Sequence, residues 1–293
     1  MNEILILGGS GILGSSLVNE CKIRNISYAA PCSSVLDITK QNEILHYFSM
    51  HQPSAIVNCA AWTDVENSEI EFQQACAINA DSVKFLALTA KQADIPVVHI
   101  STDYVFDGTK ESPYSESDPT TPINGYGVSK LQGEKNLLEV FSEKAYIIRT
   151  SWLYGTSGRN FVKTILKKAL VRDRIQVVED QLGSPTNSED LAQGILGILK
   201  KMPQEGIYNY CNKGQISWYE FALKIYELAG ADVGLVEPIH SNLYLSKVQR
   251  PSRSLLSVDK WNKSGITDLV SWEESLSRIF PRILDSINKE ISS

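Results

Sequence analysis

The first fourteen residues constrain the fold more than any other segment. Ile4 to Leu7 form an apolar run typical of a strand that is buried on both faces. The run leads into Gly8-Gly9-Ser10-Gly11-Ile12-Leu13-Gly14, after which apolar residues recur with helical spacing. This order predicts a dinucleotide site, because glycines admit a pyrophosphate close to the backbone and a helix N-terminus offers free N–H groups. The spacing Gly-x-x-Gly-x-x-Gly differs from the plain fingerprint, and an ordinary glycine-rich turn is the alternative.

Apolar and helical segments alternate through the first half of the chain. This alternation predicts an α/β protein with a doubly wound, Rossmann-like parallel sheet covered by helices on both faces. Ligands of such sheets bind beyond the carboxyl ends of the strands, where Gly8-Gly9, Asn58–Ala61 and Ser101–Asp103 are expected. The expected strands are 3–7, 26–30, 55–59, 96–101 and 145–149, and the expected helices are 12–24, 40–51, 69–93 and 125–141.

After residue 151 the pattern becomes less regular. We therefore predict an NAD(P)-binding domain over residues 1–151 and a smaller C-terminal substrate lobe over 152–293. Parts near 156–200 are expected to return to the first domain. The expected elements here are helices at 160–172, 188–201, 217–229 and 271–289, a strand at 176–179, and a connector at 202–206.

Tyr126 and Lys130 stand four residues apart in a helical segment, so their side chains share one face. A nearby ammonium favours phenolate and would lower the pKa of the tyrosine towards neutrality, which suits a general acid. Thr102, at the end of a strand, offers a hydroxyl to the reacting oxygen. An isolated Tyr-x-x-x-Lys is weak, since a packed tyrosine beside a solvated lysine is common, but the N-terminal motif strengthens it.

The end of the second expected strand indicates which cofactor binds. An NAD-selective site often has an acidic residue there for the ribose 2′-hydroxyl, whereas this chain has Ala30-Pro31-Cys32-Ser33-Ser34. Ser33 and Ser34 leave room for a 2′-phosphate, so we predict NADP(H) as the preferred cofactor and NAD(H) as the alternative. Asp37 either reaches the adenine amino group or caps the helix that starts near Lys40, and both can hold.

Composition excludes several classes of function. The net charge of −6 argues against general nucleic-acid binding, and no apolar run reaches the roughly 18 residues that span a membrane. The start of the chain lacks the features of a signal peptide. The five cysteines are scattered without a Cys-x-x-Cys, and the four histidines are isolated, so we predict no disulfide framework and no metal site. A location in the reducing cytoplasm fits.

Several longer motifs resemble those of the extended short-chain dehydrogenase/reductase superfamily and, more narrowly, the dTDP-4-dehydrorhamnose reductase family. The resemblance covers most of the chain. The matching segments are 58–66, 101–108, 126–134, 149–155, 180–186 and 250–251.

The resemblance implies a role for each matching residue. Tyr126 would protonate the C4 oxygen of a keto sugar while NAD(P)H delivers hydride, and Thr102 would hold that oxygen. Asp103 and Trp152 would line the sugar pocket, with core packing as the alternative for Trp152. Arg250 and Arg253 would bind the diphosphate of the dTDP-sugar, with surface solvation as the alternative. The expected cofactor contacts are Gly8, Ser10, Gly11, Ile12, Leu13, Gly14, Ser33, Asp37, Ile38, Ala60, Ala61, Thr63, Tyr126 and Lys130.

The implied reaction is reduction of dTDP-4-dehydro-6-deoxy-L-mannose to dTDP-L-rhamnose. Related sugar-nucleotide dehydratases carry an Asp-Glu pair after the strand-end threonine, whereas this chain has Asp103-Tyr104, which disfavours dehydration. One alternative is reduction of another nucleotide-linked 4-keto-6-deoxysugar. Another is a non-catalytic NADP-binding subunit resembling the regulatory subunit of methionine adenosyltransferase. The resemblance also allows a homodimer.

Overall fold

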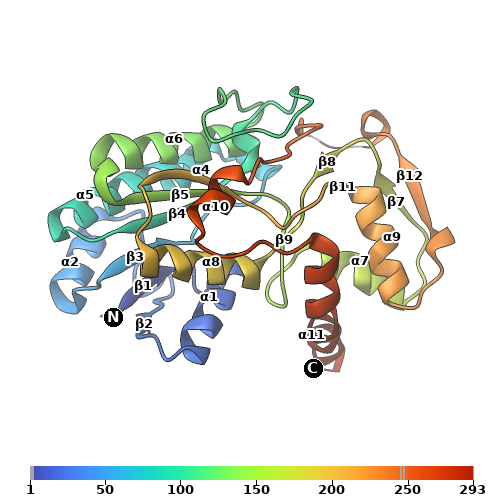
Figure 1. The fold of residues 1–293 in the computed structure, drawn as a ribbon, viewed down its shortest axis with the longest axis horizontal. Coiled ribbons are helices and arrows are strands. Elements are labelled where there is room, and N and C mark those ends of the chain that lie inside the picture. The colour runs from blue at the N-terminus through green and yellow to red at the C-terminus, as the bar shows by residue number, and fades with distance from the viewer. Residues whose placement is uncertain (1–2, 245, 247, 293) are drawn as a thin grey trace.

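A parallel sheet of six strands forms the centre of the protein, as seen in a computed structural model that describes residues 3–244, 246 and 248–292 (Figure 1). Its strand order, β10-β5-β4-β3-β1-β2, reverses direction between β1 and β3, which is where doubly wound sheets bind ligands. The predicted α/β class is confirmed. The strands are β1 Ile4–Leu7, β2 Tyr28–Ala29, β3 Ala55–Asn58, β4 Val97–Thr102, β5 Ala145–Thr150 and β10 Gly206–Tyr210.

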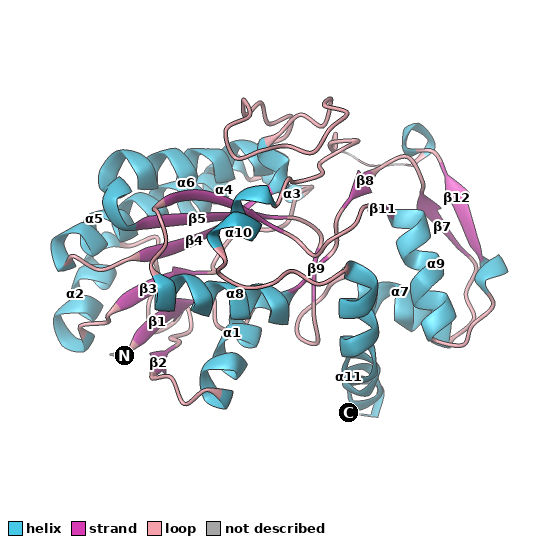
Figure 2. Ribbon diagram, in the orientation of Figure 1, coloured by secondary structure: helices cyan, strands magenta, loops and turns pink. Residues whose placement is uncertain are grey.

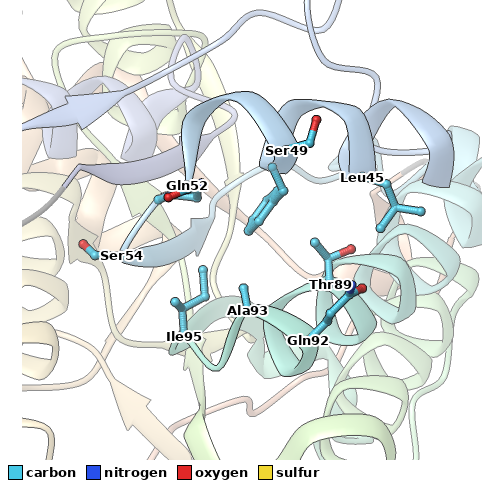
Figure 3. A pocket seen from close by; sticks show the side chains of 10 residues that line it. Leu45, Ser49, Gln52, Ser54, Thr89, Gln92, Ala93 and Ile95 are labelled. Atoms are coloured by element: carbon cyan, nitrogen blue, oxygen red, sulfur yellow. The ribbon is translucent and has the colours of Figure 1, made fainter.

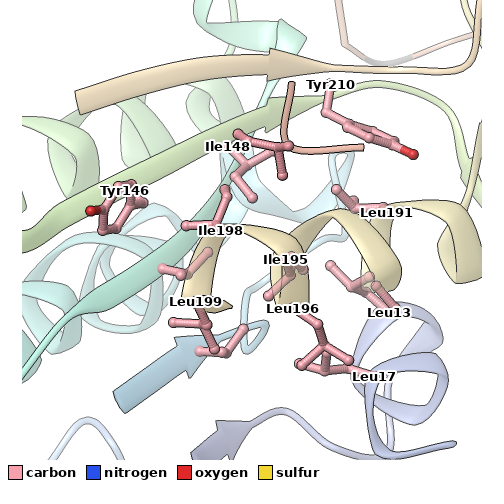
Figure 4. Packing of buried hydrophobic residues seen from close by; sticks show 14 of the residues in the cluster. Leu13, Leu17, Tyr146, Ile148, Leu191, Ile195, Leu196, Ile198, Leu199 and Tyr210 are labelled. Atoms are coloured by element: carbon pink, nitrogen blue, oxygen red, sulfur yellow. The ribbon is translucent and has the colours of Figure 1, made fainter. Parts of the chain in front are cut away.

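Helices cover both faces of this sheet (Figure 2). On one face pack α1 Ile12–Ile23, α8 Ser188–Lys201 and α10 Asp259–Ser264. Figure 4 shows Leu13 and Leu17 of α1 meeting Leu196 of α8 beneath Ile148 of β5. On the other face pack α2 Gln41–His51, α5 Ser82–Ala93 and α6 Gly125–Phe141. Burial on both faces explains the continuous apolar runs Ile4–Leu7 of β1 and 55–57 of β3.

The region predicted as one helix, 69–93, is instead broken. It contains α3 Asn67–Ile70, α4 Phe72–Cys76, a π-helical turn Ala77–Asp81 and α5. The π turn buries Asn79, whose side chain bonds the backbone of Trp62 and the hydroxyl of Ser129 on α6. The wider turn thereby places a polar anchor between the loop after β3 and helix α6, in keeping with the frequent occurrence of π-bulges near functional sites.

The remaining elements form a lobe with its own hydrophobic core, on the right in Figure 1. Three short strand pairs, β6–β9, β8–β11 and β7–β12, lie in or beside it. Helices α7 Phe161–Leu170, α9 Trp218–Leu228 and α11 Trp272–Ser292 pack together through residues such as Phe221 and Ile283. The strands are β6 Leu153–Tyr154, β7 Ile175–Val178, β8 Leu182–Gly183, β9 Thr186–Asn187, β11 Ile216–Ser217 and β12 Val236–Ile239.

Two elements of the sheet domain were not expected from the sequence. Strand β10 follows the connector and pairs with β5, and α10 brings Trp261 against Tyr208 and Tyr210 of that strand. The chain therefore returns to the sheet after its first excursion into the lobe. Among the described residues, no helix is both long enough and apolar enough to cross a membrane.

Candidate active site

A cleft of about 920 Å³ opens at the carboxyl ends of β1, β3, β4 and β5. Most residues that the sequence predicted for the site line it, whereas Gly14, Arg250 and Arg253 are not among its lining residues. The predicted residues that line it are Gly8, Ser10, Gly11, Ile12, Leu13, Ser33, Asp37, Ile38, Ala60, Ala61, Thr63, Thr102, Asp103, Tyr126, Lys130 and Trp152.

The glycine turn forms the floor of one end of the cleft. Gly8 has a positive φ of 73°, and a Cβ there would lie 2.7 Å from the backbone nitrogen of Ala60. At Gly14 a Cβ would lie 2.1 Å from the carbonyl oxygen of Gly8, so this glycine lets α1 pack on the turn. Helix α1 starts after Gly11 without a side-chain cap, so its first N–H groups keep their capacity to bind an anion.

At the adenosine end expected for a cofactor, Asp37 does not cap α2. Its Oδ1 accepts hydrogen bonds from the backbone and hydroxyl of Thr39, and its carboxylate lies 3.4 Å from the Lys40 ammonium. Those hydrogen bonds lower the pKa of Asp37. The capping alternative was therefore wrong. Asp37 accepts hydrogen bonds within its own turn, which ends at Thr39, one residue before the helix cap Lys40.

Tyr126 lies one residue inside α6, with its ring facing the cleft. The helix is started by Asn124, whose side chain accepts a hydrogen bond of 2.8 Å from the Gly127 N–H. The ring of Tyr104 packs edge-on against the Tyr126 ring, with the two ring centres 5.7 Å apart. Burial raises the pKa of the Tyr126 phenol above its ordinary value, and a hydrogen bond with Thr102 opposes that shift. The structure thus brings Thr102 and Tyr126 together as predicted.

Lys130 is buried one turn further along α6, but its amine points towards β4. Nζ donates a 2.6 Å hydrogen bond to the carbonyl of Ile100 and lies 3.5 Å from Nε2 of His99. Burial lowers the pKa of Lys130 to about 8, against the influence of Glu134 and Cys59. The sequence suggested that Lys130 lowers the pKa of Tyr126. That interpretation was wrong, because burial of the phenol dominates and raises it.

An ion pair beneath the cleft was missed by the sequence analysis. Glu134 lies one turn beyond Lys130 and accepts two hydrogen bonds from Arg149 of β5, at 2.9 and 2.6 Å. Ser101 of β4 donates a third, at 2.5 Å. The Arg149 guanidinium also lies 5.1 Å from the centre of the Phe106 ring. Both charged side chains are at most 3% exposed, so this pair fixes α6 on the sheet.

Asp103 presents a buried carboxyl group to the cleft. Burial raises its pKa to about 7, although hydrogen bonds with Ser254 and Thr102 oppose the shift. Its Oδ1 accepts a hydrogen bond of 3.1 Å from the Thr102 hydroxyl. Its Oδ2 has no hydrogen-bond partner among the residues that the structure describes. A buried oxygen without a partner beside the cleft is suited to accept a hydrogen bond from a bound ligand.

Trp152 is held between two neighbours. Its backbone adopts a φ of 48°, which is rare for a bulky residue. The ring of Trp218 stacks on it at 3.5 Å and 9°. A Cβ on Gly183 would lie only 2.3 Å from its indole atoms, so Gly183 contacts the other face. Trp218, the first residue of α9, was not predicted as a site residue. The motif Ser217-x-x-Glu220, which forms a capping box there, could have located the start of this helix.

The two arginines predicted for the diphosphate are not among the residues that line the cleft. Arg250 is 3.7 Å from Glu66 and contacts the Tyr104 hydroxyl, whose pKa burial raises to about 12 against the influence of Arg250. Arg253 forms a backbone bridge with Leu182. The structure does not bring either guanidinium into the lining of the cleft, so a role in diphosphate binding stays a prediction.

A second cavity, of about 590 Å³, lies near the amino ends of β3 and β4 (Figure 3). It is formed between α2 and α5 by side chains such as Leu45, Thr89 and Ile95. None of the predicted site residues lines it. Within the described part of the chain, no group of three His, Cys, Asp or Glu residues could hold a metal ion.

A parallel sheet with a glycine turn at its switch point, a threonine at the end of β4 and a Tyr–Lys pair on α6 defines an extended short-chain dehydrogenase/reductase. The chain belongs to the family described as RmlD substrate binding domain, whose model matches residues 1–284. The predicted family is thereby confirmed.

The chain is similar to other proteins over nearly their full length. A dTDP-4-dehydrorhamnose reductase of Aggregatibacter actinomycetemcomitans is 37% identical, over 95% of this chain and 98% of that protein. A dTDP-4-keto-6-deoxy-D-glucose reductase of Streptomyces niveus is 36% identical, over 94% and 96%. The crystal structure of dTDP-4-dehydrorhamnose reductase from Bacillus anthracis in complex with NADP superposes with a TM-score of 0.91, at 36% identity over 96% and 99%.

Proposed function

We propose that this protein reduces the C4 ketone of dTDP-4-dehydro-6-deoxy-L-mannose to the alcohol of dTDP-L-rhamnose, with NADPH as the preferred reductant. The observation that carries the proposal is the gathering of Thr102, Tyr126 and Lys130 in the cleft that also contains the glycine turn. The names of the relatives support a dTDP-linked 4-keto sugar as substrate.

The cleft fits a dinucleotide, because Gly8, Gly9 and Gly11 line its floor without side chains and the first N–H groups of α1 have no side-chain cap. A nicotinamide cofactor bound there supplies hydride to C4, and Lys130 and the glycine turn would hold its ribose and pyrophosphate. No acidic residue follows β2 where NAD-selective sites often have one, and Ser33 lines that end of the cleft.

Tyr126 would donate its phenolic proton to the C4 oxygen as the alcohol forms. Its raised pKa keeps the phenol protonated before the reaction, which suits a general acid. Thr102 would hold the same oxygen through its hydroxyl, since it already lies beside the phenol. Asp103, with a carboxyl oxygen that lacks a partner among the described residues, would accept a hydrogen bond from a sugar hydroxyl.

The test supplies the 4-keto sugar, made enzymatically from dTDP-glucose, and follows NADPH oxidation with chromatography of the product. Formation of the rhamnose nucleotide is expected, and no NADPH oxidation would overturn the proposal. Titration by fluorescence should show NADPH binding at least as tightly as NADH. A tenfold preference for NADH, about 1.4 kcal/mol, would contradict the role given to Ser33.

A second candidate changes the sugar but not the chemistry. The Streptomyces niveus relative is named for a D-glucose-configured substrate, and it is nearly as similar as the rhamnose-type relative. Offering the 4-keto sugar before and after epimerisation distinguishes the two, because each product has its own retention time. The non-catalytic subunit, the homodimer and the cytoplasmic location remain predictions.

A further inference from the structure

A chain of buried hydrogen bonds runs from β3 to Lys130. The backbone N–H of Ala60 lies 3.1 Å from Oδ1 of Asn58, and Nδ2 of Asn58 lies 3.2 Å from Nδ1 of His99. Nε2 of His99 then lies 3.5 Å from Nζ of Lys130. The side chains of Asn58, His99 and Lys130 are at most 2% exposed. Asn58 and His99 cannot exchange their partners for bulk water without a local opening of the fold, whereas Lys130 also lines the cleft.

The first hydrogen bond of this series fixes which groups donate and which accept in the others. A backbone N–H can only donate, so the Asn58 atom that it meets must be the amide oxygen, and the amide NH₂ must face His99. An NH₂ group also only donates, so Nδ1 of His99 is an acceptor. Burial, with Lys130 nearby, holds the pKa of His99 well below its ordinary value. The neutral ring then carries its proton on Nε2, facing Lys130.

A donor aimed at Nζ has a consequence for Lys130. An ammonium group has no lone pair, so it and the Nε2–H of His99 would face each other as two donors. A neutral amine can accept from Nε2–H and still donate to the carbonyl of Ile100, 2.6 Å away. The hydrogen-bond chain therefore favours the neutral form of Lys130.

We propose that Asn58 and His99 are positioning residues that set the proton affinity of Lys130, so that this lysine changes its charge close to neutral pH. The lysine would otherwise stay an ammonium throughout the working range of an enzyme. The catalytic consequence rests on the proposed function, since it requires Lys130 to act beside Tyr126. The direction of the hydrogen-bond chain does not.

Two neighbouring groups, Glu134 and Cys59, favour the ammonium form of Lys130, but burial outweighs them. On its own helix, the carboxylate of Glu134 already pairs with Arg149, and the pKa of Tyr126 is raised by burial. After β3, burial raises the pKa of the Cys59 thiol to about 12, so it carries no charge. Among the ion pairs formed by described residues, none involves Lys130. Burial lowers its pKa to about 8, in the same direction as the donor from His99.

The first test reads the His99 tautomer directly in the full-length wild-type protein. Imidazole ¹⁵N shifts distinguish a ring protonated at Nε2 from one protonated at Nδ1, and the His99→Gln variant assigns the signal among the four histidines. The expected result is an Nε2–H tautomer that stays neutral across the range of stable pH. An Nδ1–H tautomer or a charged ring would overturn the proposal, whether or not the protein turns over any sugar.

The second test reverses the direction of the hydrogen bonds between residue 58, His99 and Lys130. In Asn58→Asp the carboxylate accepts from both Ala60 N–H and His99, so the ring proton moves to Nδ1 and Nε2 becomes an acceptor for an ammonium. The titration midpoint of Lys130, followed with ¹³C-labelled lysine and assigned by Lys130→Met, should rise by about one pH unit. An exposed histidine, changed in His46→Gln, provides the matched control and should leave the midpoint unchanged.

The kinetic readout separates tuning from simple loss of structure. In Asn58→Asp the alkaline limb of the pH profile of kcat should move to higher pH, together with the titration midpoint of Lys130. KM for the sugar should change little. A midpoint that stays in place in a folded Asn58→Asp protein would refute the tuning. Absence of turnover in wild type would instead refute the proposed function and leave the NMR result standing.

Discussion

The buried pair of Glu134 and Arg149 should be among the most sensitive points for stability, because it fixes the helix that carries Tyr126 and Lys130. Replacing Glu134 with Gln keeps the shape and an acceptor for Ser101 but leaves the guanidinium without a counter-charge. Two unit charges about 4 Å apart attract by about 4 kcal/mol at an effective dielectric constant of about 20. Removing one partner of a buried pair costs about 3–5 kcal/mol. We expect Glu134→Gln to lose stability in that range.

The same reasoning predicts that a second substitution rescues the first. In Glu134→Gln/Arg149→Met no charge remains buried, and the thioether still packs on Phe106. The double variant should be more stable than the sum of the two single losses by about 2–3 kcal/mol, because the residues are in direct contact. Arg149→Met alone should be strongly destabilised, since it leaves a buried carboxylate with Ser101 as its remaining side-chain donor.

Urea unfolding followed by far-ultraviolet circular dichroism measures these changes, with the denaturant slope checked for each variant. Glu227→Gln, which breaks an exposed pair with Lys224 on α9, serves as the control and should change stability little. Additive losses in the double variant, or a loss below about 1 kcal/mol in Glu134→Gln, would refute the argument, because either outcome would mean that solvent already reaches the pair.

Three further changes test the site. Tyr126→Phe should lower turnover about 10²–10⁴-fold with unchanged NADPH binding by fluorescence, and turnover near that of wild type would contradict its role as acid. Gly183→Ala should displace the Trp152 indole, cost about 1–3 kcal/mol and raise KM for the sugar; an unchanged KM in steady-state assays would show that the indole position does not matter. The raised pKa of Asp103, about 7, means that its contribution to stability is complete below about pH 4 and is lost as pH rises through 7. Asp103→Asn should therefore show a smaller fall in unfolding free energy from about pH 4 to 8, and equal slopes would exclude a raised pKa.

Local patterns in the sequence predicted the sheet and the position of the cleft. The first five strands are short segments rich in apolar residues, and Gly8, Asn58 and Thr102 follow or end three of them. The carboxyl ends of parallel strands lie on the same side of the sheet, so the proximity of these residues can be predicted without knowing how side chains pack. The same reasoning explains why Thr102, Tyr126 and the glycine turn were placed correctly in one cleft.

Interactions between distant segments were not predictable in this way. Strand β10 starts with Gly206 and contains a buried Asn209, so it has fewer consecutive apolar residues than β1 or β3. The amine of Lys130 turns towards His99 because of burial, which helical spacing alone does not define. Trp218 reaches Trp152 from another part of the chain. The inward orientation of Glu134 could have been predicted, since this residue continues the helix face that carries Tyr126 and Lys130.

The repeated passage of the chain between sheet and lobe has a consequence for how such proteins diversify. After β5 the chain enters the lobe, returns with α8 and β10, leaves again with α9, returns with α10 and ends in α11. No single cut separates the two hydrophobic cores, so recombination cannot exchange the lobe as a cassette. New sugar preferences in this architecture are therefore expected to accumulate by point substitutions at the cleft, which leaves relatives similar in length and different in substrate.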